Sequence, residues 1–168
     1  MKITSYTLLI LCLLSSSCVR DSERNVVRRD RKADVVQVEK SDREMSAAIA
    51  QAQQTSGDFI KVLKSPKSNQ SGFSVKYPFT DGPTVEHMWV NDLSFDGHSF
   101  AGVLNNYPND LSNFFYGQKV TVSQSGISDW MYVEDGRLIG GFTLRVLFKD
   151  YPPEKLRELE ESLGFKVE

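Results

Sequence analysis

Cysteine and histidine are scarce in this sequence, and their scarcity excludes several kinds of site. The chain has two cysteines, Cys12 and Cys18, so residues 19–168 contain no thiol for disulfides, thiolate catalysis or cysteine–zinc binding. Its two histidines, His87 and His98, show no His-Glu-x-x-His spacing, and no local pattern indicates carboxylates that would complete a metal site. We therefore expect neither a bound metal nor a cofactor.

Positive charge is not in excess either. The chain has 20 Lys and Arg against 22 Asp and Glu, a formal net charge of −2 and a pI of about 5.8. Nucleic-acid binding usually requires an overall basic field, so nucleic acid is not an expected partner. The 168 residues, 40% of them hydrophobic and 11% aromatic, suffice for one compact domain with appendages.

The apolar run near the start is too short for a permanent membrane span. It extends from Tyr6 to Leu14 after Lys2 and predicts a secretory signal over residues 1–17. The stretch ending at Cys18 resembles a bacterial lipobox, but Ser15 holds the place of the usual aliphatic residue, so ordinary signal cleavage is the alternative. We expect export and a lipid anchor on Cys18 at the periplasmic side of the bacterial envelope. Val19 favours the outer membrane over the inner.

Three segments are predicted between the signal and the main domain. Residues 18–40 are polar and charge-rich, which indicates a solvated tether; contact of its basic residues with anionic lipid is the alternative. Ser41 and Glu44 have the spacing of a capping box and predict a helix over residues 41–57, with Gly57 as its stop. Its narrow, alanine-rich apolar face predicts loose docking on the domain or on a partner. Residues 58–72 are expected to be a connector.

Residues 73–168 have the pattern of a small β-rich domain. Alternating apolar residues predict strands over 73–79, 85–93 and 99–104, and a fourth short strand follows Gly117. Residues 127–133 and 138–148 are predicted to form a hairpin around Glu134-Asp135-Gly136, and a final helix runs from Pro153 to a cap at Gly164. The prediction is an α+β fold: a small, strongly bent antiparallel sheet or partly closed barrel with an N-terminal and a C-terminal helix.

Three motifs carry a resemblance to a known family. They are Glu86-His87-Met88-Trp89-Val90, Asp129-Trp130-Met131-Tyr132-Val133 and Gly140-Gly141-Phe142-Thr143-Leu144-Arg145. With them, residues 72–168 resemble the bacterial YegJ-like family, domain of unknown function 2314. The resemblance implies the domain itself and no particular activity, and it leaves residues 1–71 outside.

His87 is the residue that most suggests catalysis. Neighbours in a strand point to opposite faces, so Glu86 and His87 are not expected to form a hydrogen-bonded pair. Ser123, Ser125 and Ser128 lie near the second motif, but none has the Gly-x-Ser-x-Gly setting of a nucleophile. We expect a structural histidine, and a small hydrolase that uses His87 with Glu86 or Asp129 is the alternative.

Asp129 and Arg145 form the stronger pair of candidates, because the predicted hairpin would place them side by side. They are expected either to form an ion pair that fixes the hairpin register or to leave Arg145 as a fork for a ligand carboxylate or phosphate, with Trp89 and Trp130 as an aromatic wall. Tryptophan and arginine also anchor many protein interfaces. We therefore predict a binding or interaction module rather than an enzyme, whose partner is a protein or a small anionic ligand. An immunity-like partner protein is a further alternative.

Overall fold

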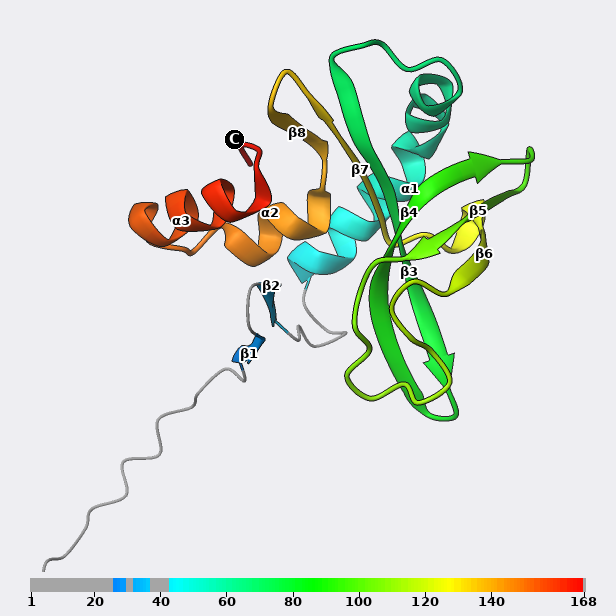
Figure 1. The fold of residues 1–168 in the computed structure, drawn as a ribbon, viewed down its shortest axis with the longest axis horizontal. Coiled ribbons are helices and arrows are strands. Elements are labelled where there is room, and N and C mark those ends of the chain that lie inside the picture. Colours follow the sequence, from blue (N-terminus) through cyan, green and yellow to red (C-terminus); the bar gives the residue numbers. More distant parts are fainter. Residues whose placement is uncertain (1–25, 30–31, 37–42, 168) are drawn as a thin grey trace, which may run out of the picture.

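The computed structural model describes residues 26–29, 32–36 and 43–167 of the chain (Figure 1). Its elements are, in order, β1 (Val26–Arg29), β2 (Lys32–Val36), α1 (Arg43–Lys64), β3 (Gln70–Asp81), β4 (Thr84–Phe95), β5 (Ser99–Leu104), β6 (Lys119–Ser123), the short 3-10 helix η1 (Gln124–Gly126), β7 (Asp129–Glu134), β8 (Arg137–Gly140), α2 (Phe142–Phe148) and α3 (Pro153–Leu163). The signal over residues 1–17, and Cys18, lie outside the described residues. No helix of the described part is long and apolar enough to cross a membrane.

An antiparallel sheet of six strands, in the order β6-β5-β4-β3-β7-β8, forms the body of the domain. The long strands β3 and β4 pair from Asp81↔Thr84 to Val75↔Val90. Register shifts in β3 and β4 interrupt the pairing with β7 and β5, and such bulges bend and twist a sheet. The predicted α+β class with a small bent sheet and flanking helices is therefore confirmed, and the sheet stays open rather than closing into a barrel.

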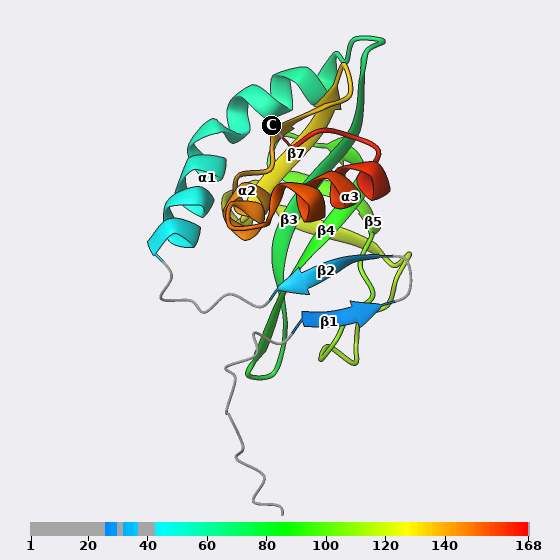
Figure 2. The same ribbon diagram turned by 90° about the vertical axis from the view of Figure 1, so that its left-hand side faces the viewer.

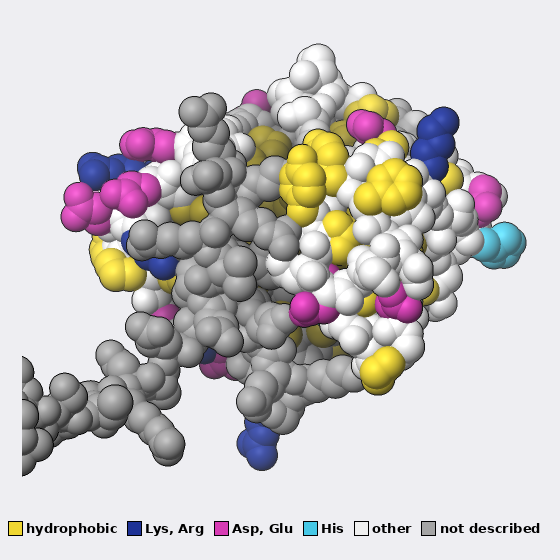
Figure 3. All heavy atoms as spheres, turned by 60° about the horizontal axis from the view of Figure 1, so that its bottom comes forward, with side chains coloured by type: hydrophobic (Ala, Val, Ile, Leu, Met, Phe, Trp, Pro, Cys, Tyr) yellow, Lys and Arg dark blue, Asp and Glu magenta, His cyan; other side chains and the backbone are white. Residues whose placement is uncertain are grey.

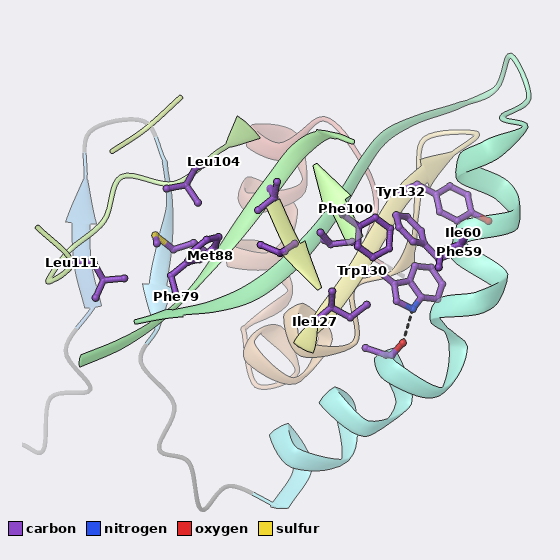
Figure 4. Close-up of a cluster of buried hydrophobic side chains, with 14 residues drawn as sticks. Phe59, Ile60, Phe79, Met88, Phe100, Leu104, Leu111, Ile127, Trp130 and Tyr132 are labelled. Carbon is purple, nitrogen blue, oxygen red and sulfur yellow. Dashed lines mark hydrogen bonds between the residues drawn. The ribbon is translucent and has the colours of Figure 1, made fainter. Parts of the chain in front are cut away.

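Helix α1 covers one face of the sheet and supplies part of the main core (Figure 4). Phe59 of α1 is 1% exposed and stacks on Trp130 of β7 with ring centroids 5.2 Å apart. The indole Nε1 of Trp130 donates a hydrogen bond to the Ala52 carbonyl at 3.0 Å, which ties the strand to the helix backbone. The expectation of a loosely docked helix was therefore wrong, because α1 is part of the core.

The same helix runs seven residues beyond Gly57, its predicted stop. Gly57 does not adopt the left-handed conformation that ends many helices, and Phe59 and Ile60 continue the buried face that begins at Ala48 and Ala52. Most of the predicted connector over residues 58–72 therefore belongs to α1 and to the start of β3.

Helices α2 and α3 lie next to each other (Figure 2). They pack on a second, smaller hydrophobic cluster. Leu138, Phe148 and Val167 are its buried members, and Met131 packs against them, while the neighbouring Trp130 belongs to the main core. Helix α3 begins with Pro153 and ends at a left-handed Gly164, as the sequence predicted. The two sides of β7 thus face two different clusters.

The predicted strand over residues 138–148 is wrong beyond Gly140. Gly140 and Gly141 both have positive φ, 74° and 63°. A Cβ on Gly140 would lie 2.3 Å from the Trp130 carbonyl oxygen, so only glycine fits this close approach. The two glycines turn the chain out of β8, and residues 142–148 form α2 instead of continuing the hairpin.

The predicted tether over residues 18–40 contains the two-stranded antiparallel sheet of β1 and β2. In the structure β2 lies beside α3. The remaining residues of that segment lie outside the described part of the chain.

Candidate functional site

The Asp129 carboxylate caps helix α2 from a distant strand. It is fully buried and accepts the backbone N–H groups of Phe142 and Thr143 at 3.1 and 2.8 Å and the Thr143 hydroxyl at 2.6 Å. A carboxylate in this position satisfies amides that lack partners in the first turn of a helix. Burial raises the pKa of the Asp129 carboxyl above its usual value, and the hydrogen bonds from Thr143 oppose that shift.

Lys76 lies in the middle of the same sheet face. It pairs with Trp89 on one side and with Asp129 on the other. Its ammonium is 5.5 Å from the centre of the Trp89 ring and 3.4 Å from the Thr143 hydroxyl. Burial lowers the pKa of Lys76, and the nearby Asp129 carboxylate opposes that shift. Asp129, Lys76 and Thr143 therefore connect the sheet to helix α2, and their arrangement serves to stabilise this packing.

Sequence reasoning did not assign a role to Lys76 or Thr143. A lysine among the alternating apolar residues of a strand, and a threonine just after the glycine pair, were the available signals. Both signals are weak, because surface strands often carry lysine and threonine is a common strand residue.

Arg145 does not form the expected ion pair with Asp129. It lies in α2, and its guanidinium donates to three backbone carbonyls: that of Gly140 at 3.1 Å, that of Leu138 at 2.8 Å and that of Val167. The side chain therefore fastens strand β8 and the last described residues to α2. Each of the three guanidinium nitrogens donates to a backbone carbonyl, so this side chain is not an open fork for an anionic ligand.

The two tryptophans do not form one wall. Trp130 is 6% exposed and belongs to the main core beside α1, whereas Trp89 is half-buried beside Lys76 on the other sheet face. A recognition face that combines both rings with Arg145 is therefore not assembled in this fold.

His87 and Glu86 have separate environments on β4. The His87 ring Nδ1 lies 2.8 Å from the Ser128 hydroxyl, and Ser128 is 3% exposed. The Glu86 carboxylate accepts the backbone N–H of Asn109 at 2.8 Å and its side-chain amide at 3.2 Å. A hydrolase would use the carboxylate of Glu86 or Asp129 as the partner of His87. Both carboxylates instead accept hydrogen bonds from backbone amides.

No cluster of three or more His, Cys, Asp or Glu side chains in the described part of the chain is placed to hold a metal ion. A shallow, open groove lies over β4, β5 and β6 and is lined by residues such as Asp92, Gly102 and Lys119. Lys76, His87 and the other candidate site residues are not among the residues that line it.

The most exposed aromatic side chains lie on the loop between β5 and β6, residues 105–118, which we call the aromatic loop. Phe115 is 63% exposed, Tyr107 49% and Tyr116 46%, and the two tyrosine rings stack with centroids 4.7 Å apart. Large exposed aromatic groups that are neighbours in space are an informative departure from an ordinary soluble surface. No role was assigned to this loop from the sequence.

The aromatic loop is fastened to the sheet at several points. Asn106 accepts the backbone N–H of Trp89 at 2.6 Å, and Glu86 accepts that of Asn109. Leu111 is 3% exposed within the main core, and the Ser112 hydroxyl donates to Asp81 at 3.1 Å. Two predicted site residues, Glu86 and Trp89, thus hold this loop in place through its backbone and side chains.

Comparison with known proteins gives the family. Residues 42–167 match the family model described as "Uncharacterized protein conserved in bacteria (DUF2314)". The protein YegJ of Escherichia coli K12 is 37% identical over 119 residues, which cover 71% of this chain and 76% of that protein. A "Putative ankyrin repeat protein" of Neisseria meningitidis serogroup B is 42% identical over 94 residues, which cover 54% of this chain and 37% of that protein. No solved structure matches.

The match also extends the resemblance deduced from the motifs. It begins at residue 42 rather than near 72 and so includes helix α1, in agreement with the place of that helix in the core. On the strength of the model match and of the similarity to YegJ, the chain belongs to the DUF2314 family of bacterial proteins.

Proposed function

We propose that this protein is an exported, lipid-anchored binding module of the bacterial envelope and that it binds its partner with the aromatic loop. The observation that carries the binding role is the exposure of Phe115 beside the stacked Tyr107 and Tyr116 on a loop fastened to the sheet. Tyrosine and phenylalanine provide large contact areas with few rotatable bonds, so binding costs little conformational entropy.

The fastening of the loop supports the proposal. An anchored loop presents its side chains in one arrangement, and pre-organisation lowers the cost of association. The contacts of Glu86 with Asn109 and of Asn106 with Trp89 supply that anchorage. Binding residues are often found on loops that a rigid scaffold positions in this way.

Export and lipidation are proposed from the sequence of residues 1–18, where an apolar segment precedes Cys18. A lipid anchor would hold the domain at the envelope surface, and a second interaction with a partner there would be favoured by the high effective concentration that the anchor gives. A binding surface on the folded domain supplies such a second interaction.

The binding role can be tested by photo-crosslinking in cells. A crosslinking amino acid in place of Tyr107 should capture a discrete partner, whereas one in place of the exposed Ser125 on η1 should not. Phe115→Ser should abolish the crosslink, and Asn113→Ser, an exposed polar change in the same loop, should preserve it. Equal crosslinking by both loop variants, at matched protein abundance, would contradict binding through the aromatic loop.

A small hydrolase is the second candidate, and the 2.8 Å contact between His87 and Ser128 favours it. The near-complete burial of Ser128 argues against access of a substrate to its hydroxyl. His87→Gln keeps hydrogen-bonding capacity but cannot exchange protons near neutral pH. We expect the Tyr107 crosslink and any cellular phenotype to tolerate His87→Gln; loss of the phenotype in folded protein would favour the hydrolase.

A further inference from the structure

Positive charge is missing from the aromatic loop and from strands β4 and β5, which precede it in the chain. Residues 77–118 contain Asp81, Glu86, Asp92, Asp96 and Asp110 but neither lysine nor arginine. At the average of the chain, 20 in 168, a stretch of 42 residues would carry five. The local charge of −5 therefore contrasts with the nearly neutral chain as a whole.

Three of these carboxylates lie at the base of the aromatic loop. Asp81 accepts the Ser112 hydroxyl, Glu86 accepts the Asn109 backbone, and Asp110 is an exposed residue of the loop itself. On the face shown in Figure 3, hydrophobic side chains gather with acidic side chains close beside them. The exposed rings and the carboxylates thus belong to one surface.

The charge and the rings together define the chemistry of the partner. A negative surface repels anionic lipid headgroups and nucleic-acid phosphates, and it attracts lysine and arginine. The faces of aromatic rings also attract cations. The exposed area of these rings is best buried by apolar groups of the partner. A neutral apolar segment would leave the carboxylates without complementary charge.

We propose that the aromatic loop binds a polypeptide segment in which lysine or arginine residues alternate with apolar ones. This inference rests on the proposed binding function and specifies its partner. The apolar residues cover Phe115 and the tyrosine stack, and the cations lie beside Asp81 and Asp110. Such a contact depends on salt because part of its free energy comes from exposed charges.

The test uses the full-length protein in detergent and two short synthetic peptides. One contains lysine, phenylalanine and serine; the other has glutamate in place of every lysine. We expect the lysine peptide to bind at least about tenfold more tightly by calorimetry, with an affinity that falls as salt is raised. Phe115→Ser should weaken it by about tenfold or more, a typical loss for an interface anchor.

The charge contribution has its own variants. Asp81→Asn together with Asp110→Asn should weaken the lysine peptide several-fold and reduce its salt dependence, whereas Asn113→Ser should leave both unchanged. Equal binding of the two peptides would overturn the inference, as would preferential binding to vesicles rich in phosphatidylglycerol. If the peptides fail while Phe115→Ser still abolishes the crosslink at residue 107, the loop binds a partner of other chemistry. If the crosslink also persists in Phe115→Ser, the binding function itself is wrong.

Discussion

Asp129 on strand β7 accepts both the backbone N–H and the hydroxyl of Thr143, at 2.8 and 2.6 Å, and so fixes the start of helix α2 from a strand 14 residues earlier in the chain. The contact between Asp129 and Thr143 favours a helix after Gly141. It takes the place of the Asp129–Arg145 ion pair that was expected from the predicted hairpin. The carboxylate serves as a helix cap, and the guanidinium serves as a clamp on backbone carbonyls.

The first prediction is that Asp129 and Thr143 are energetically coupled. Asp129→Asn should lower the unfolding free energy by about 2–3 kcal/mol, because buried hydrogen bonds to a charged group are lost. Thr143→Val should cost about 1–2 kcal/mol, since only the hydroxyl contact is removed. Chemical denaturation of both single variants and the double variant should show non-additivity of about 1 kcal/mol or more. Strict additivity would contradict direct contact.

The second prediction concerns the acid side of the stability profile. Because the pKa of Asp129 is raised in the folded protein, the native state holds more protons than the unfolded state between the ordinary value, 3.8, and the raised one. The contribution of Asp129 to the unfolding free energy should therefore fall as the pH rises through that window. Denaturation at a series of pH values should show wild type losing stability relative to Asp129→Asn as the pH rises. A constant difference between them would contradict the shift.

Lys76 should act on the alkaline side with the opposite sign. Its pKa is lowered from 10.5, so the native state holds fewer protons than the unfolded state below that value. Its contribution to the unfolding free energy should increase as the pH rises towards 10.5. This increase should be absent in Lys76→Met. A matched change at the exposed Lys64, Lys64→Met, should leave the alkaline profile of wild type unchanged. If both variants gave the wild-type slope, burial of the Lys76 ammonium would be refuted.

The third prediction separates a clamp from a ligand fork. Arg145→Lys keeps the charge but cannot reach three carbonyls in one plane, so it should lower the unfolding free energy by about 2 kcal/mol. Arg157→Lys, at an exposed ion pair with Glu154, should cost less than about 1 kcal/mol. Thermal or chemical denaturation measures both. Wild-type stability of Arg145→Lys, combined with loss of the partner crosslink, would return Arg145 to the role of a ligand fork.

The fourth prediction concerns Cys18. Wild-type protein should incorporate labelled palmitate and partition into the detergent phase, while Cys18→Ala should do neither. Cys12→Ala, which changes the cysteine inside the apolar segment, should behave as wild type. Aqueous partitioning of wild type and Cys18→Ala alike would refute lipidation and leave ordinary signal cleavage as the explanation.

The strands were predictable wherever one face of the sheet is buried. The third strand was predicted over residues 99–104 and is found at Ser99–Leu104, because Phe100 and Leu104 reach the core at even spacing. The final helix was equally clear, since Pro153 and Gly164 mark its ends. The class of the fold followed from these local signals.

Helix α2 was not predictable in the same way, because its sequence alternates like a strand. Phe142, Leu144, Val146 and Phe148 are apolar at every second position. The left-handed glycines before it and the distant Asp129 carboxylate override that pattern. Tertiary contact decided the structure, and no local window of sequence contains both partners.

The candidate site was predictable only in part, for the same reason. Glu86, His87 and Trp89 were singled out as residue types, but their partners Asn109, Ser128 and Asn106 come from other loops and strands. The aromatic loop was overlooked because exposure, rather than residue type, distinguishes its rings from those of the core.

Gly140 has a consequence for how this domain can change over evolutionary time. Any side chain there would collide with the Trp130 carbonyl and ring, and Trp130 in turn rests on Phe59 and the backbone of Ala52. A substitution at Gly140 is therefore tolerable only if the indole moves, and the indole can move only if α1 repacks. We therefore expect substitutions in α1, β7 and β8 at these contacts to depend on one another, although α1 lies far from the two strands in the chain.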